Sequence, residues 1–211
     1  MKTRVLPWSL MFAAVFAPAT AFCATDDEPA IMRSVREKYG AAKTVQASFV
    51  QRTWWAVREK EETKSGTLLT GGGDTFRVEL GGVLWVCDGA TVWQYSKASS
   101  QVIIRALSAI DPSSHPSRML LTYVNTVGWR RTGDTAGVVT VEAAADSALH
   151  RGPVRMRINA RTAAILAVMT QDDNGNRNTY TFTSIRLNAP APKGSFAFAV
   201  PKNANVLDTR N

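Results

Sequence analysis

The chain has 211 residues and carries 25 Lys and Arg against 17 Asp and Glu, a formal net charge of +8 at pH 7. This length predicts one domain with room for a sizeable core. Because no run of Lys and Arg exceeds two residues, the basic balance indicates a solvated basic face, or contact with anionic lipid or an acidic protein, and argues against a nucleic-acid-binding protein.

The N-terminus has the parts of a secretory signal peptide. An opening segment with one Lys and one Arg leads into an apolar stretch that ends at Phe16, and small residues precede and include Ala21. Prolines interrupt the apolar stretch, and it is too short to span a bilayer comfortably, which disfavours a membrane anchor. We predict a signal peptide over residues 1–23, cut after Ala21 or Cys23, and a single exported, soluble domain over residues 24–211.

The chain has two cysteines, Cys23 and Cys87. Cleavage after Ala21 would leave both, and they could then form a disulfide. Cleavage after Cys23 would leave Cys87 alone, packed as a small apolar residue. A lipid anchor on Cys23 is disfavoured, because Thr20 and Phe22 stand where a lipoprotein signal has Leu and a small residue.

The first predicted element of the domain is a helix. Acidic residues followed by Pro29 suit a helix start, and Ile31, Val35 and Tyr39 recur at intervals of four on one face. Gly40 ends the pattern.

From residue 44 onward the hydrophobic period changes to two, which predicts strands separated by glycine-rich and Asp-Gly turns. A loop and a short helix interrupt the series at residues 111–116 and 117–124. Because no helical pattern lies between successive strands, the sheet should be largely antiparallel. A tail, residues 196–201, should pack across it. The predicted strands cover residues 45–50, 66–69, 75–80, 83–96 (a hairpin), 101–107, 127–132, 137–143, 153–159, 165–171 and 178–187.

The sequence holds few of the patterns that accompany catalysis. His115 and His150 are the only histidines, and neither has a cysteine or carboxylate at metal-ligand spacing. There is no Gly-x-Ser-x-Gly elbow and no phosphate-binding glycine loop. Residues 172–176 lack the ligand spacing and closing glutamate of a calcium loop, so we predict a turn. We therefore predict a protein that is not an enzyme and has no cofactor and no metal.

The hairpin over residues 83–96 is apolar on both faces, whereas most other predicted strands have one polar face. We expect the face with Leu84, Val86, Trp93 and Tyr95 to line a cavity. We expect the opposite face, which carries Trp85, to lie under the C-terminal tail.

About ten strands with so few helices cannot all be covered by helix packing. A curved sheet of this size closes on its own side chains or encloses a ligand cavity. The sequence thus predicts a mainly β, half-open antiparallel barrel with an N-terminal helix and a short helical lid over an apolar, acyl-binding cavity. The candidate cavity residues are Phe49, Phe76, Val78, Leu80, Leu84, Val86, Trp93, Tyr95, Met119, Leu120, Val154, Met156, Ile158, Tyr180 and Phe182.

The order and spacing of several segments resembles the periplasmic outer-membrane lipoprotein carrier family, LolA. The segments are residues 45–51, 66–68, 76–79, 86–95, 178–182 and the ending at 196–208. The resemblance implies a lidded half-barrel in the periplasm that carries the acyl chains of lipoproteins without covalent chemistry. It also implies a monomer that receives cargo from an inner-membrane ABC transporter and passes it to an outer-membrane receptor, with transient contact to the membrane surface.

One position departs from the family pattern. Many of these carriers have a basic residue that latches the lid at the place where this chain has residues 71–73, all glycine. Either Arg77 or another basic group substitutes, or the lid is looser, or the cargo differs. Alternative functions are therefore a specialised carrier of a glycolipid or other acylated product, a lipid-anchored receptor of the same fold, and a sensor of misrouted lipoprotein. Trp54 and Trp55, before a charged run, predict a hairpin tip that either is solvated or touches a membrane or partner.

Overall fold

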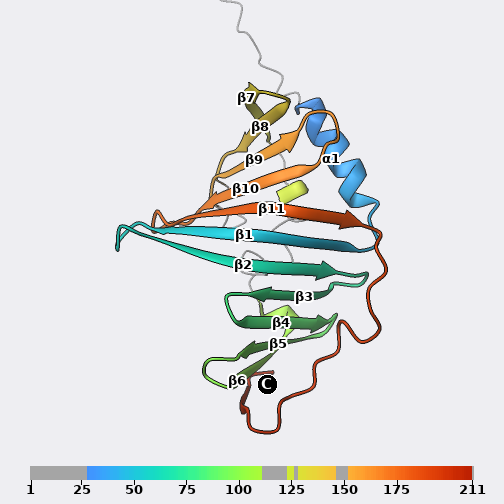
Figure 1. Cartoon of the computed structure of the whole chain (residues 1–211), viewed down its shortest axis with the longest axis vertical. Helices are drawn as coiled ribbons and strands as arrows, with labels where there is room; N and C mark the ends of the chain where they lie inside the picture. Colours follow the sequence, from blue (N-terminus) through green and yellow to red (C-terminus); the bar gives the residue numbers. More distant parts are fainter. Residues whose placement is uncertain (1–27, 111–122, 126–127, 146–151, 211) are drawn as a thin grey trace, which may run out of the picture.

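The computed structural model describes residues 28–110, 123–125, 128–145 and 152–210. Over these residues the chain forms one twisted sheet with an N-terminal α-helix against it (Figure 1). The elements are α1 (Ala30–Gly40), β1 (Val45–Trp55), β2 (Lys60–Thr70), β3 (Thr75–Leu80), β4 (Val83–Asp88), β5 (Thr91–Ser96), β6 (Gln101–Ala106), the 3-10 turn η1 (Leu107–Ala109), β7 (Arg130–Thr135), β8 (Val138–Ala143), β9 (Val154–Asn159), β10 (Ile165–Gln171), β11 (Arg177–Leu187) and β12 (Asn205–Asp208).

The sheet is built from two meanders that meet at the pair β1–β11. Within the described residues the strand order is β12-β6-β5-β4-β3-β2-β1-β11-β10-β9-β8-β7. Every neighbouring pair is antiparallel except β12 with β6, which is parallel. The sheet is open, with β12 and β7 at its edges. The predicted mainly β class, the antiparallel sheet and the N-terminal helix are confirmed.

Three differences from the sequence prediction have local causes. β1 and β2 are each 11 residues long and form a hairpin that projects beyond the sheet, with a turn between Trp55 and Lys60 (Figure 1). The first part of β2, residues 60–65, has no strand signature in the sequence because all six residues are polar. β7 starts at Arg130 instead of 127, and its register with β8 shifts between Arg131 and Gly133. β12 has no strand signature in the sequence, because it is short and has no buried face.

Helix α1 packs on one face of the sheet, which we call the inner face. Met32, Val35 and Tyr39 are buried and belong to the hydrophobic core. The backbone N–H of Ile165 in β10 donates a hydrogen bond of 3.1 Å to the Tyr39 hydroxyl. The helix therefore covers the part of the inner face near β10. Packing against this face explains why apolar residues recur along one side of the helix.

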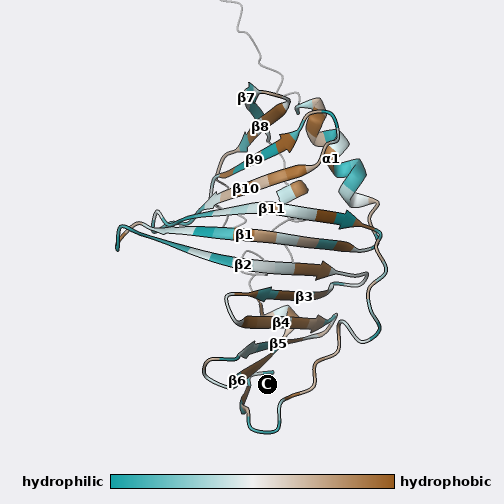
Figure 2. Cartoon of the chain, in the orientation of Figure 1, coloured by the Kyte–Doolittle hydropathy of each residue, from teal (hydrophilic) through white to brown (hydrophobic). Residues whose placement is uncertain are grey.

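Strand register assigns every side chain to a face, because partners in an antiparallel pair point the same way. The inner face of β1 carries Val45, Ala47 and Phe49 at one end and Gln51 and Thr53 toward the hairpin tip. Figure 2 shows the same gradient, with hydrophobic colouring at one end of β2 and hydrophilic colouring at the projecting tip. The predicted lid helix and loop fall almost wholly outside the described residues, as do Met119 and Leu120.

Candidate functional site

The inner face gathers most of the residues predicted to line a cavity. The pairs Thr70–Phe76, Leu68–Val78 and Phe49–Gly66 connect β1, β2 and β3 on this face. The pairs Val168–Tyr180 and Val168–Met156 extend the same face across β11, β10 and β9. The predicted residues that share it are Phe49, Phe76, Val78, Leu80, Val154, Met156, Ile158, Tyr180 and Phe182.

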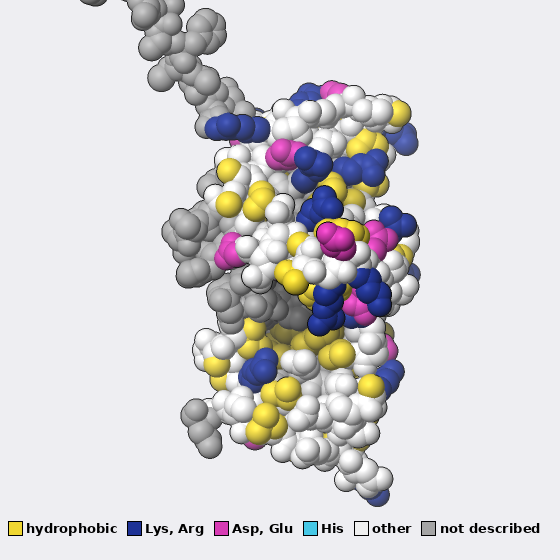
Figure 3. Space-filling view, turned by 90° about the vertical axis from the view of Figure 1, so that its left-hand side faces the viewer, with side chains coloured by type: hydrophobic (Ala, Val, Ile, Leu, Met, Phe, Trp, Pro, Cys, Tyr) yellow, Lys and Arg dark blue, Asp and Glu magenta, His cyan; other side chains and the backbone are white. Residues whose placement is uncertain are grey.

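Burial divides these residues into two groups. Six of the nine are buried in the core that also contains the helix residues: Phe49, Phe76, Val78, Val154, Met156 and Ile158. Leu80, Tyr180 and Phe182 are only partly buried, and so is Trp85, which shares the inner face with Val78. The second group forms an apolar surface beside the closed core. In Figure 3, hydrophobic side chains gather in a hollow in the lower half of the molecule.

An aromatic cluster lies at the centre of the inner face. The ring of Phe49 contacts Tyr180 edge-on at 6.0 Å between centroids and Phe182 at 6.1 Å. Gly66 makes room for it, because a Cβ there would lie 2.6 Å from the Phe49 Cζ atom. The lack of a side chain at Gly66 thus fixes how Phe49 lies across β2.

Next to this cluster, toward the hairpin tip, is a polar ladder that sequence reasoning did not single out. The Gln51 amide donates to the Asn178 side-chain oxygen (3.0 Å) and to the Tyr180 hydroxyl (3.2 Å), and the Thr53 hydroxyl donates to the same Asn178 oxygen (2.7 Å). Burial, with the nearby Tyr123, raises the pKa of Tyr180 to about 12. The sequence could have predicted that Gln51 and Thr53 share a face with Phe49, because the three residues occupy alternate positions along β1.

The faces of the β4–β5 hairpin are the reverse of those expected. Trp85, Cys87 and Val92 lie on the inner face with Phe76 and Val78. The outer face of the hairpin instead carries four residues that were expected to line the cavity with Phe76, and that placement is wrong. These residues are Leu84, Val86, Trp93 and Tyr95.

The C-terminal segment (residues 189–204) covers this outer face. The Phe198 ring stacks on Trp93 at 6.3 Å and 28° and contacts Tyr95 at 6.1 Å. The two-residue turn at Gly81 and Gly82 determines which face of the sheet each side chain of β4 occupies. It pairs Leu80 with Val83 and so places Leu84 and Val86 opposite the polar side chains of β3.

The basic residues near the absent latch position lie on different faces. Arg77 is on the outer face, where its guanidinium donates to the backbone oxygen of Ser195 in the C-terminal segment (3.5 Å). Gly71, in the all-glycine stretch, lies against the ring of Phe196. Lys64 has inner-face register opposite Gln51, and its stem lies over Gly81 while its ammonium pairs with Glu62 at 3.2 Å. Arg77 therefore does not take the latch position on the inner face.

Cys87 is buried, and burial raises the pKa of its thiol. It packs as a small apolar residue of the inner face, while Cys23 lies outside the described residues. Among the described residues, His, Cys, Asp and Glu form no group of three that could hold a metal ion. No helix in the described part of the chain is long and apolar enough to cross a bilayer.

The fold has known counterparts. An uncharacterized conserved protein from Thermus thermophilus superposes with a TM-score of 0.56 at 15% identity, over 85% of this chain and 98% of that chain. A LolA superfamily protein from Nitrosomonas europaea matches at 12% identity over 79% of this chain and 97% of that chain, with a TM-score of 0.45. At that lower score the likeness supports no inference of its own.

No curated protein matches the chain. The family model described as outer membrane lipoprotein carrier protein LolA matches residues 40–199, which run from the end of α1 through the aromatic cluster to Ala199. Because this match spans most of the chain, the protein belongs to the LolA family of outer membrane lipoprotein carrier proteins.

Proposed function

We propose that the protein is a periplasmic carrier that binds the acyl chains of lipoproteins on its inner face and shuttles them from the inner to the outer membrane. The observation that carries the proposal is the partly buried apolar surface of Leu80, Trp85, Tyr180 and Phe182 beside a closed core. Family membership supports the same reading. Of the cavity residues predicted on this face, the partly buried Leu80, Tyr180 and Phe182 are its proposed contacts.

The gradient along β1 and β11 suits a cargo with two chemical parts. Each buried methylene of an acyl chain contributes about 0.8 kcal/mol, so the aromatic cluster provides the attractive surface. The polar ladder of Gln51, Thr53 and Asn178 then borders the end of the face where a glycerol or peptide part would leave it. Amide and hydroxyl groups suit that part, because each of them can both donate and accept hydrogen bonds.

The proposal includes export and a non-catalytic role. Residues 1–23 would direct the chain out of the cytoplasm and be removed, leaving residues 24–211 as one monomeric carrier domain. An inner-membrane ABC transporter would load it and an outer-membrane receptor would unload it. Transfer requires only that the receptor bind the acyl chains more tightly, so no cofactor or metal is needed.

A specialised cargo is the second candidate. The glycine stretch at 71–73 has no basic side chain, and Arg77 lies on the outer face. A carrier without that latch suits a glycolipid or another acylated product as well as it suits lipoproteins.

Native mass spectrometry of the protein purified from its own periplasm tests both candidates. We expect a bound acylated molecule, and extraction then identifies it as a lipoprotein or as another lipid. A protein that carries no acylated molecule, and that binds none when offered triacylated lipopeptide, would contradict the proposal. The intact mass also separates the receptor alternative, because only a lipid-anchored receptor would carry acyl groups on Cys23.

A further inference from the structure

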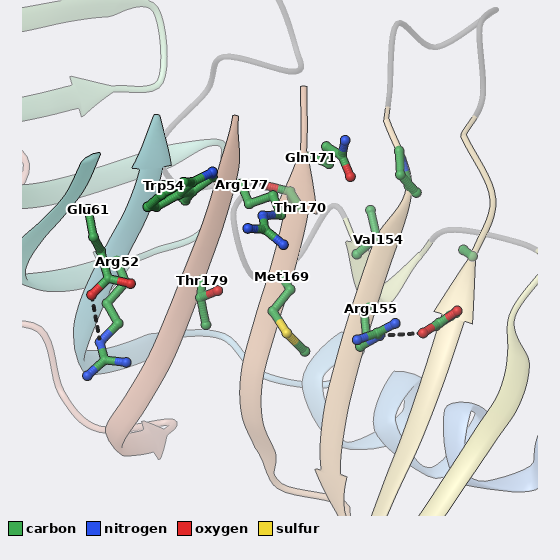
Figure 4. Close-up of a pocket in the computed structure, with 13 residues that line it drawn as sticks. Arg52, Trp54, Glu61, Val154, Arg155, Met169, Thr170, Gln171, Arg177 and Thr179 are labelled. Carbon is green, nitrogen blue, oxygen red and sulfur yellow. Dashed lines mark hydrogen bonds and ion pairs between the residues drawn. The ribbon is translucent and has the colours of Figure 1, made fainter. Parts of the chain in front are cut away.

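The outer face carries a recess that the proposed lipid binding does not use. It has a volume of about 490 Å³ and lies over β1, β11, β10 and β9, mostly on the side of the sheet away from α1. Near the ends of β8, β9 and β10 it also touches Ala143, Val154 and Thr170, which have inner-face register. Figure 4 shows the side chains that line it. They include three arginines, Arg52, Arg155 and Arg177, and the apolar side chains of Trp54 and Met169.

Strand register builds the recess from two neighbouring rows of side chains. One row runs from Glu61 through Trp54 and Arg177 to Gln171 across β2, β1, β11 and β10. The next row runs from Arg52 through Thr179, Met169 and Arg155 to Glu142 across β1, β11, β10, β9 and β8. Thr179 is short and the arginines on either side of it are long. The side chains of the second row therefore extend less far from the sheet in the middle of the row than at its two sides.

Two of the three arginines already hold a carboxylate. Arg155 is hydrogen-bonded to Glu142, and Arg52 lies 3.9 Å from Glu61, a loose pair with both side chains more than half exposed. These two contacts show that a carboxylate fits against the arginines at the sides of the recess. At Arg52, an incoming carboxylate would meet a guanidinium whose present partner, Glu61, is held weakly.

Arg177 is arranged differently. Its guanidinium carbon lies 5.9 Å from the centroid of the Trp54 ring (Figure 4). Among the described residues, no carboxylate forms an ion pair with it. The ring restricts the guanidinium and leaves its hydrogen-bonding edge for a ligand. Trp and Arg are also the residues most enriched at the energetic centres of protein interfaces.

The dimensions favour a peptide. Arg52 and Arg155 stand three strands apart, about 14 Å at the usual strand spacing of ~4.8 Å. That is the length of about four extended residues. A flat membrane surface would meet the projecting hairpin before it reached arginines on the walls of a recess. The apolar surface of Met169 and Trp54 between the cations suits a hydrophobic side chain flanked by acidic ones.

We propose that this recess docks an acidic, extended segment of a partner protein, with Arg177 as the central contact and Arg52 and Arg155 at the two ends. The site lies on the opposite face of the sheet from the acyl-binding surface. It can therefore be occupied whether or not cargo is bound, and it does not depend on the proposed lipid binding.

Fluorescence anisotropy tests the proposal with a fluorescein-labelled peptide of sequence Glu-Leu-Glu-Glu-Leu-Glu-Glu-Leu and no lipid added. We expect saturable binding that weakens about tenfold in Arg177→Gln and in Arg52→Gln, the loss of one charge-assisted contact. Arg186→Gln is the matched control, because Arg186 is on the same strand and face but outside the recess, hydrogen-bonded to Gln46. It should change affinity less than twofold.

Trp54→Ala provides an independent variant, since it removes the ring beside Arg177 and leaves every charge in place. It should weaken binding severalfold with an unchanged far-UV circular dichroism spectrum. Four outcomes overturn the proposal: equal loss in the Arg186→Gln control, equal binding of a peptide with Gln in place of Glu, displacement by 1 mM inorganic phosphate, and no peptide binding. Sedimentation with phosphatidylglycerol vesicles that depends on Arg177, without peptide binding, would assign the recess to a lipid headgroup instead.

Discussion

The two tryptophans of the β4–β5 hairpin allow a matched test of which sheet face binds cargo. Trp85 is on the inner face beside Val78, and Trp93 is on the outer face under Phe198. Both are partly buried and lie in adjacent strands of one hairpin. Replacing each with Ala removes the same number of atoms from opposite faces.

The expected cost in stability is similar for the two variants. A fully buried Trp→Ala change costs about 3–5 kcal/mol, and partial burial reduces this to about 2 kcal/mol. For a domain of this size that lowers the melting temperature by about 4–8 °C. Trp93→Ala also loses the stacked contact with Phe198, which contributes about 0.5–1.5 kcal/mol in such pairs.

Acyl binding should separate the variants. Trp85→Ala should weaken binding of a fluorescent fatty acid about tenfold, since losing about 1.4 kcal/mol of apolar contact corresponds to that factor. Trp93→Ala should bind within twofold of the unchanged protein. Both are measured well below their melting temperatures. If Trp93→Ala lost the ligand and Trp85→Ala kept it, the assignment of the acyl-binding site to the inner face would be wrong.

Three further outcomes follow from the contacts. Gly66→Ala should destabilise the protein by about 1–3 kcal/mol in urea unfolding, because its Cβ would overlap the Phe49 ring and the Glu79 carbonyl, whereas Gly72→Ala, with open space around it, should not. Phe198→Ala should cost about 1.5 kcal/mol and expose Trp93, seen as a red shift in tryptophan emission, with acyl binding retained. Burial raises the pKa of Tyr180 from 10.0 to about 12, so the folded state holds this proton more tightly than the unfolded state. Its contribution is fully present below pH 10 and lost between pH 10 and 12, and Tyr180→Phe should flatten that part of the stability curve.

Strand order and face assignment were predictable wherever short turns connect the strands. Alternate residues along a strand share a face, and a two-residue turn such as Gly81-Gly82 fixes which residues of the next strand lie opposite them. This rule is sufficient to place Trp85 on the same face as Val78. The apolar pattern of the hairpin alone does not distinguish its two faces; only its pairing with β3, Val78 opposite Trp85, does so. Its two apolar faces are both used, one by the core and one by Phe198.

Contacts between distant segments were not predictable from local patterns. The pairing of β1 with β11 joins residues more than 120 positions apart, and it creates the polar ladder by bringing Asn178 to Gln51. The outer-face recess has the same origin, since Arg52 and Arg155 come from opposite meanders and meet only across that junction. Charge alternation along each strand indicated a solvated face, and only the register shows that these arginines are neighbours.

The β1–β11 junction of the two meanders thus contributes paired side chains to both faces of the sheet. On the inner side, Phe49 and Tyr180 meet across β1 and β11 to form the aromatic cluster, and on the outer side Trp54 and Arg177 meet across the same pair. A side chain's direction alternates along each strand, so one pair of strands presents apolar surface to the inside and cations to the outside. A partner held at the recess would therefore contact the same two strands that contact the cargo. Any change in the β1–β11 register on cargo binding would be felt at Arg177, because slipping the pair by one residue would separate it from Trp54.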